Sequence, residues 1–124
     1  MSVNRTSTKY RVTGEFVAKA ELLYTNTSQT TIVELPANAV IWSISIETVI
    51  DFTGSGTDLI DIGITGEGDR YLDGTDITSA GWLMDQWNAG ERMSGLTNIT
   101  FTYVDENSDA GAGQAFIYIR YSIH

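Results

Sequence analysis

Cysteine is absent from the 124 residues of this chain, and histidine occurs once, as the last residue, His124. Disulfides, thiolate metal sites and a cysteine nucleophile are therefore excluded. A Ser-His-Asp triad would depend on a terminal residue, and no motif places a base beside a serine. Carboxylates are numerous, but spacing in the sequence does not identify the close pair that a glycosidase needs, and surface acids are usually only solvated. We therefore predict no catalytic residues and no enzyme.

Long apolar runs are also missing, and the opening stretch "MSVNRTSTKYRVTGE" is polar. Neither a signal peptide nor a membrane-spanning helix is expected, which predicts a soluble protein made in the cytoplasm and not bound to membranes. Only 7 Lys and Arg stand against 16 Asp and Glu, for a net charge of −9. Nucleic-acid binding needs a basic stripe, so no nucleic-acid partner is expected.

The few cations gather at the N-terminus. Residues 1–20 contain four Lys and Arg against Glu15 alone, a balance of +3, which leaves −12 for the rest of the chain. A polar terminus of this kind is commonly a solvated tail. The charge contrast also suggests a tether, in which Arg5, Lys9 and Arg11 contact an acidic partner surface. We predict an arm over residues 1–11 and one folded domain over residues 12–124.

Along that domain the dominant hydrophobic period is two, which is typical of strands with one buried face. In "NAVIWSISIETVIDF" one face of the alternation is apolar, which predicts a long core strand with Trp42 in the core; its residues are Val40, Trp42, Ile44, Ile46, Ile50 and Phe52. Helical spacing also fits residues 16–24, but the neighbouring segments favour a strand there. Further strands are expected at residues 31–35, 60–64, 99–103 and 115–123.

Short strands separated by Gly, Asn, Asp and Ser loops predict an all-β protein, a single-domain β-sandwich or jelly roll of about six to eight antiparallel strands. Trp82 and Trp87 lie in "GWLMDQWNAGERM", which has no sustained period. We expect these two rings to contact another subunit or partner. Plugging one end of the sandwich and stacking on a sugar remain open alternatives.

The stretch "GITGEGDRYLDGTDITSAG", residues 63–81, combines five glycines with Asp69, Asp73 and Asp76. Its aspartates do not have the spacing of a calcium-binding EF-hand, and it lacks the lysine and following helix of a phosphate loop. Turn chemistry fits better, because Gly66 and Gly68 permit positive φ and Asp73-Gly74 favours a tight turn. We predict a structural loop with no metal or cofactor; an irregular calcium site and a partner contact stay open.

The order of three stretches resembles the small β-sandwich virion proteins of tailed bacteriophages, among them head decoration (cement) proteins. The stretches are "IVELPANAVIWSISIETVIDF", "DLIDIGITGEGDRYLDGTDITSAGW" and "TNITFTYVDENSDAGAGQAFIYIRYSI". The likeness is one of layout and spans roughly residues 15–123. The resemblance implies a jelly-roll fold and a homotrimer. It also implies that the protein sits on the outside of the phage head and clamps subunits of the major capsid protein together.

Two classes of function therefore compete. The first is a non-enzymatic virion protein, made in the host cytoplasm and placed on the outer head surface, with a phage tail or fibre component as an alternative location. The second is a carbohydrate-binding jelly roll with Trp82 and Trp87 as its platform. Fold alone does not decide between them, and the exposure of the two indole rings is the discriminating observation.

Overall fold

A computed structural model describes residues 15–85 and 92–123 of the chain, with residues 84 and 85 described for their backbone only. The described residues form eight antiparallel strands: β1 (Glu15–Leu23), β2 (Thr30–Leu35), β3 (Ala39–Ile50), β4 (Asp58–Ile64), β5 (Glu67–Asp76), β6 (Gly81–Asp85), β7 (Thr97–Asp105) and β8 (Gln114–Ile123). Among these residues no helix is long and apolar enough to cross a membrane.

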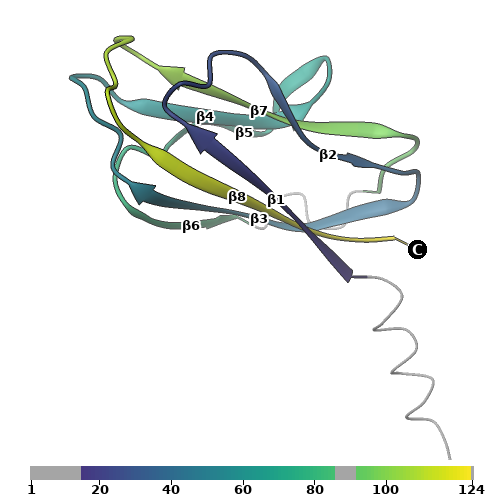
Figure 1. The fold of residues 1–124 in the computed structure, drawn as a ribbon. Helices are drawn as coiled ribbons and strands as arrows, with labels where there is room; N and C mark the ends of the chain where they lie inside the picture. The colour runs from purple at the N-terminus through teal and green to yellow at the C-terminus, as the bar shows by residue number, and fades with distance from the viewer. Residues whose placement is uncertain (1–14, 86–91, 124) are drawn as a thin grey trace, which may run out of the picture.

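The strands make two four-stranded sheets, ordered β1-β8-β3-β6 and β2-β7-β4-β5, which pack face to face (Figure 1). Every connection crosses from one sheet to the other except the β4–β5 hairpin. This interleaved order is that of a jelly roll, which protects strand edges by closing two sheets over one core. The prediction of an all-β, single-domain sandwich of six to eight strands is confirmed.

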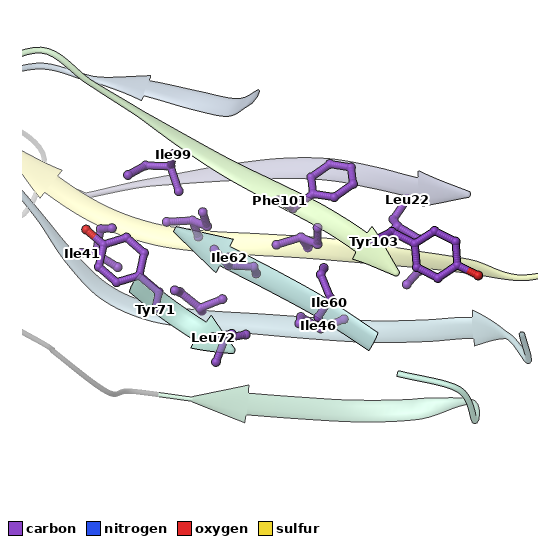
Figure 2. Close-up of a cluster of buried hydrophobic side chains, with 14 of the residues drawn as sticks. Leu22, Ile41, Ile46, Ile60, Ile62, Tyr71, Leu72, Ile99, Phe101 and Tyr103 are labelled. Carbon is purple, nitrogen blue, oxygen red and sulfur yellow. The ribbon is translucent and has the colours of Figure 1, made fainter. Parts of the chain in front are cut away.

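The core lies between the sheets and is filled by the inward-facing half of each alternating strand (Figure 2). Burying each large apolar side chain contributes roughly 1.5–3 kcal/mol, so the alternation itself drives the two sheets together. The large, fully buried side chains within strands come from both sheets and from six strands; they are Leu22, Leu35, Ile44, Ile46, Ile60, Ile62, Ile99, Phe101, Ile117 and Ile119.

Two bulges interrupt the alternation of β3, where its register against β8 shifts between Ile41 and Ser43 and again between Thr48 and Ile50. A bulge adds one residue on one strand and so reverses which face the following residues occupy. The prediction that Trp42 lies in the core is therefore wrong, because its side chain is 43% exposed. Ile50, expected on the same buried face, is exposed for the same reason.

The prediction that residues 63–81 form one structural loop is wrong, because this stretch contains the whole of β5. Gly66 turns the chain between β4 and β5 with a φ of 88°, as predicted for it. Asp73-Gly74 is a bulge within β5 instead of a tight turn: Gly74 has a φ of 66°, and its N–H donates to Asp61 Oδ1 at 2.6 Å. β5 is an edge strand, and β4 supplies a pairing partner that local turn chemistry did not reveal.

The sandwich has two distinct ends. The β1–β2, β3–β4, β5–β6 and β7–β8 connections meet at one end, which we call the distal end (Figure 1). β1 begins at Glu15 at the opposite end, which we call the arm end because residues 1–14 precede it. At about 3.3 Å per residue, the nine residues of β1 separate the two ends by about 30 Å.

Candidate functional site

Exposed apolar side chains concentrate on one of the two sheets. Of the twelve large hydrophobic side chains that are exposed among the described residues, nine belong to β1, β3, β6 or β8. They are Phe16, Val17, Leu23, Trp42, Val49, Ile50, Trp82, Leu83 and Ile123. Single exposed hydrophobics are ordinary, but a gathering on one sheet is typical of an interaction surface.

The outer side of this sheet presents what we call the aromatic face, formed by Lys19, Trp42, Trp82, Phe116 and Tyr118. The rings of Trp82 and Tyr118 stack with centroids 5.6 Å apart and an interplanar angle of 28°. The Lys19 ammonium lies 4.4 Å from the Phe116 ring centroid and 5.7 Å from that of Tyr118. Both distances are within the range of cation–π attraction, so the lysine is held on the rings.

Strand register explains why these side chains meet. Lys19 on β1 is opposite Tyr118 on β8, and Glu47 on β3 is opposite both Phe116 on β8 and Trp82 on β6. Residues directly opposite in antiparallel strands have side chains on the same face of the sheet. Four neighbouring strands therefore contribute to one continuous surface.

Trp42 joins this surface through the first bulge of β3. Its indole Nε1 donates to Ser122 Oγ at 2.7 Å, and Ser122 lies on the same side of β8 as Phe116 and Tyr118 by alternation. The hydrogen bond fixes the ring over the arm-end half of the face. The residue expected to fill the core is instead an anchored, half-exposed side chain of the outer surface.

Charges of both signs surround the aromatic rings. Arg120 forms an ion pair with Glu15 at 3.3 Å, and Gln114 Nε2 donates to Glu21 at 2.6 Å. The ion pair is exposed and contributes little to stability. Because acidic and basic groups are mixed here, the part of the face that the structure describes has no basic stripe that would track a phosphate backbone.

A second polar cluster lies at the distal end, where the buried Asp58 carboxylate accepts a hydrogen bond from Tyr103 Oη at 2.5 Å. Burial raises the pKa of Asp58, and the hydrogen bond from Tyr103 offsets part of that rise. Asp58 is only 1% exposed, so substrate does not reach its carboxyl group. The arrangement closes the end of the core and offers no accessible acid or base.

The aspartates of residues 63–81 do not converge. Asp69 and Asp73 are exposed along β5, while Asp76 Oδ1 accepts the N–H of Thr78 at 2.9 Å. Hydrogen bonds with the backbone and the side chain of Thr78 lower the pKa of Asp76. Within residues 15–85 and 92–123, no three His, Asp or Glu side chains are grouped as a metal site requires.

Of the residues singled out in the sequence, Trp82 is described and is 57% exposed. Arg5, Lys9, Arg11 and Trp87 lie outside the described residues, as does the boundary between arm and domain. Phe116 and Tyr118 were not among the contact residues predicted from the sequence. The signal was present, because both occupy outward positions of a strand whose inward positions are apolar.

No protein-family model matches the chain, and no curated protein sequence matches it. Two solved structures resemble it over most of its length. The cyanophage Pam1 capsid asymmetric unit contains a chain with a TM-score of 0.72 and 16% identity, covering 90% of this chain and 87% of that one. The acid-stable capsid of Helicobacter pylori bacteriophage KHP30 contains another, with a TM-score of 0.69, 16% identity and coverage of 88% and 87%. At such identities the likeness establishes a shared fold.

Proposed function

We propose that this chain is a non-enzymatic structural protein of a phage virion, and specifically a decoration or cement protein on the outside of the head. The observation that carries this proposal is the jelly roll it shares with chains of two phage capsid structures, over 90% and 88% of its length. The sequence layout supports it independently, because the resemblance to decoration proteins rests on strand order and loop content alone.

The aromatic face supports the proposal as the docking surface for the major capsid protein. Tryptophan, tyrosine, phenylalanine and arginine are enriched in the centres of protein interfaces. Before any partner binds, Trp82 is stacked on Tyr118, and Trp42 is hydrogen-bonded to Ser122. Binding therefore immobilises few additional side chains, and more of the contact energy is retained as affinity.

The basic arm supports an orientation in which the aromatic face rests against the shell. β1 starts directly after residues 1–14 and is an edge strand of the sheet that has the aromatic face. We propose that Arg5, Lys9 and Arg11 reach an acidic surface of the shell while the face rests against it. A homotrimer would present three arms at once and would cover exposed strand edges.

Heads of the source phage that lack this protein provide the test. Purified protein is mixed with them, and bound copies are counted by gel densitometry and located by electron microscopy. We expect saturable binding on the outer surface at positions of local threefold symmetry. Light scattering of the unbound protein should give a trimeric mass; a monomer in solution that also binds heads as single copies would contradict the trimer.

Two exposed residues give a matched pair of variants for that assay. Trp82→Ala removes a ring from the aromatic face, whereas Leu96→Ala changes a side chain that is 71% exposed and outside both sheets. Head binding should fall about tenfold or more for the first and stay unchanged for the second. Absence of binding to heads, together with detection of the protein in purified tails, would favour the tail or fibre alternative.

A further inference from the structure

A groove of about 580 Å³ crosses the distal end of the sandwich, away from the aromatic face. One wall is the connection between β1 and β2, and the other is the end of β7 with the start of its connection to β8. The lining residues are Tyr24, Thr25, Asn26, Thr27, Thr102, Tyr103, Val104, Asp105, Ser108 and Ala110. Its volume falls within the range of about 300–1,000 Å³ that is usual for small-molecule sites.

Hydrogen bonds hold the first wall of this distal groove in place. Asn26 Oδ1 accepts the N–H of Leu23 at 2.7 Å, and the N–H of Asn26 donates to Leu23 O at 2.9 Å. The N–H of Tyr24 donates to Gly113 O at 3.2 Å, which joins this wall to the β7–β8 connection. The turn is thus fixed, while the Asn26 amide nitrogen and the Tyr24 ring stay available to a ligand.

The second wall is fixed in the same manner. Asp105 Oδ2 accepts the N–H of Ala110 at 2.8 Å, and Asp105 O accepts the N–H of Ser108 at 3.1 Å. Ser108 has a φ of 53°, a left-handed conformation that is uncommon for a residue with a side chain. Backbone strain of this kind gathers at ligand-binding positions, where the surrounding structure maintains it.

The side chains of the groove select one class of ligand. They include the hydroxyl groups of Thr25, Thr27 and Ser108, which both donate and accept hydrogen bonds. Among the described residues no Lys or Arg lines the groove, and the Asp105 carboxylate repels phosphate, sulfate and acidic sugars. The lining combines apolar surface with several polar side chains, which suits a ligand that is neither purely apolar nor charged, and the single carboxylate among the described lining residues is too few for a metal ion.

We propose that the distal groove binds a neutral carbohydrate. Hydroxyl-rich sugars need both donors and acceptors, and the apolar side of a sugar ring packs on an aromatic side chain, for which Tyr24 is 37% exposed. The distal groove is not the sugar platform suggested by the sequence, because Trp82 of that platform lies on the outer face of the sheet that contains β6. Sugar binding here does not depend on the virion role, so the two proposals succeed or fail separately.

The test uses the full-length protein labelled with ¹⁵N and a set of neutral probes: glucose, galactose, mannose, N-acetylglucosamine, maltose, cellobiose and lactose. Glucuronic acid and glucose 6-phosphate serve as charged comparators. We expect at least one neutral probe to shift amide resonances of residues 24–27 and 102–110 with a Kd of about 1 mM. No shift with any neutral probe, or equal binding of the charged comparators, would overturn the proposal.

Variants separate the groove from the aromatic face. Tyr24→Ala should weaken binding of the active probe about tenfold, and Thr27→Val should weaken it by a smaller factor. Trp82→Ala, an exposed aromatic outside the groove, should leave binding unchanged, and thermal melting confirms that each variant is folded. Loss of binding in Trp82→Ala with retention in Tyr24→Ala would overturn the groove as the site.

Discussion

Tyr103 Oη donates a hydrogen bond of 2.5 Å to Asp58 Oδ1, and the two residues belong to adjacent strands at the distal end of the core. Both side chains are buried, with Asp58 1% and Tyr103 7% exposed. Burial is the main cause that raises both pKa values, and the hydrogen bond to Asp58 raises that of Tyr103 further. The pair is therefore a point at which stability depends on pH.

The Asp58 carboxyl group should make the protein less stable as the pH rises. Its folded pKa lies above the ordinary value of 3.8, so the folded state binds the proton more tightly than the unfolded state. Its contribution is most favourable below 3.8 and decreases as the pH rises through the interval up to the raised pKa. Asp58→Asn keeps the Oδ1 acceptor without the charge, and should flatten this slope in urea unfolding measured from about pH 3 to 8.

Removal of the Tyr103 hydroxyl tests the donor of the same hydrogen bond. Tyr103→Phe leaves a buried carboxylate without its donor, and should lower the free energy of unfolding by about 1.5–3 kcal/mol at pH 7. The loss should shrink at low pH, where a neutral carboxyl group is less costly to leave unpaired. Tyr118→Phe on the aromatic face is the control. Equal losses at both pH values would contradict a charged Asp58.

The sequence was sufficient for the fold class because the alternation in residues 99–103 and 115–123 is regular and both strands lie in sheet interiors. Ile99, Phe101, Ile117 and Ile119 are all fully buried, as their spacing predicts. For these segments local pattern and tertiary environment agree, and hydrophobic periodicity alone identifies the buried face.

Trp42 and β5 could not be predicted in the same way, because their conformations depend on register. The bulge that moves Trp42 outward exists only in the pairing of β3 with β8. The glycine-rich stretch of β5 becomes a strand because β4 supplies a partner with two register shifts. Long-range pairing overrides turn propensity in both cases.

Thr100 offers a stability gain. Its Oγ1 is buried and is without a hydrogen-bond partner among the described residues, and the residue is 2% exposed. A buried hydroxyl without a partner carries a desolvation penalty, and valine has nearly the same shape. Thr100→Val should therefore raise the free energy of unfolding by about 1 kcal/mol. A decrease in urea unfolding would indicate that the hydroxyl is in fact hydrogen-bonded, for example to water.

Gly63 should not tolerate a side chain. A Cβ atom at this position would collide with the backbone of Glu67 and Gly68, which folds closely over β4. Gly63→Ala should lower the free energy of unfolding by about 1–3 kcal/mol, since the obstructing atoms are backbone. Gly95→Ala is a matched control, because a Cβ there meets nothing within 4 Å. Similar melting temperatures for the two variants would show that the β4–β5 hairpin shifts without strain.

Calcium should have no effect on the stability of the protein. Asp69, Asp73 and Asp76 are spread along β5 and its end, with no convergence of oxygens on one point. A bound ion would add about 2.7 kcal/mol at a hundredfold excess over Kd. Melting temperatures in chelator and in millimolar calcium should therefore agree. A rise of several degrees with calcium would restore the irregular ion site considered for residues 63–81.

The basic arm should control attachment to the head but not folding. Each exposed ion pair contributes about 0.2–1 kcal/mol, so Arg5, Lys9 and Arg11 give one arm only modest affinity, which salt reduces further. On the proposed trimer, three arms would bind almost together, and effective concentration would then turn weak contacts into firm attachment.

Deletion of residues 2–11 should leave the melting temperature and oligomeric state unchanged, because every described core residue lies beyond them. Binding to undecorated heads should fall sharply, and charge reversal of the three cations should do the same. The binding that remains should depend less on salt, since it would rest on the aromatic face. Wild-type attachment by the shortened protein would show that this face suffices by itself, and unfolding would show that the arm belongs to the domain.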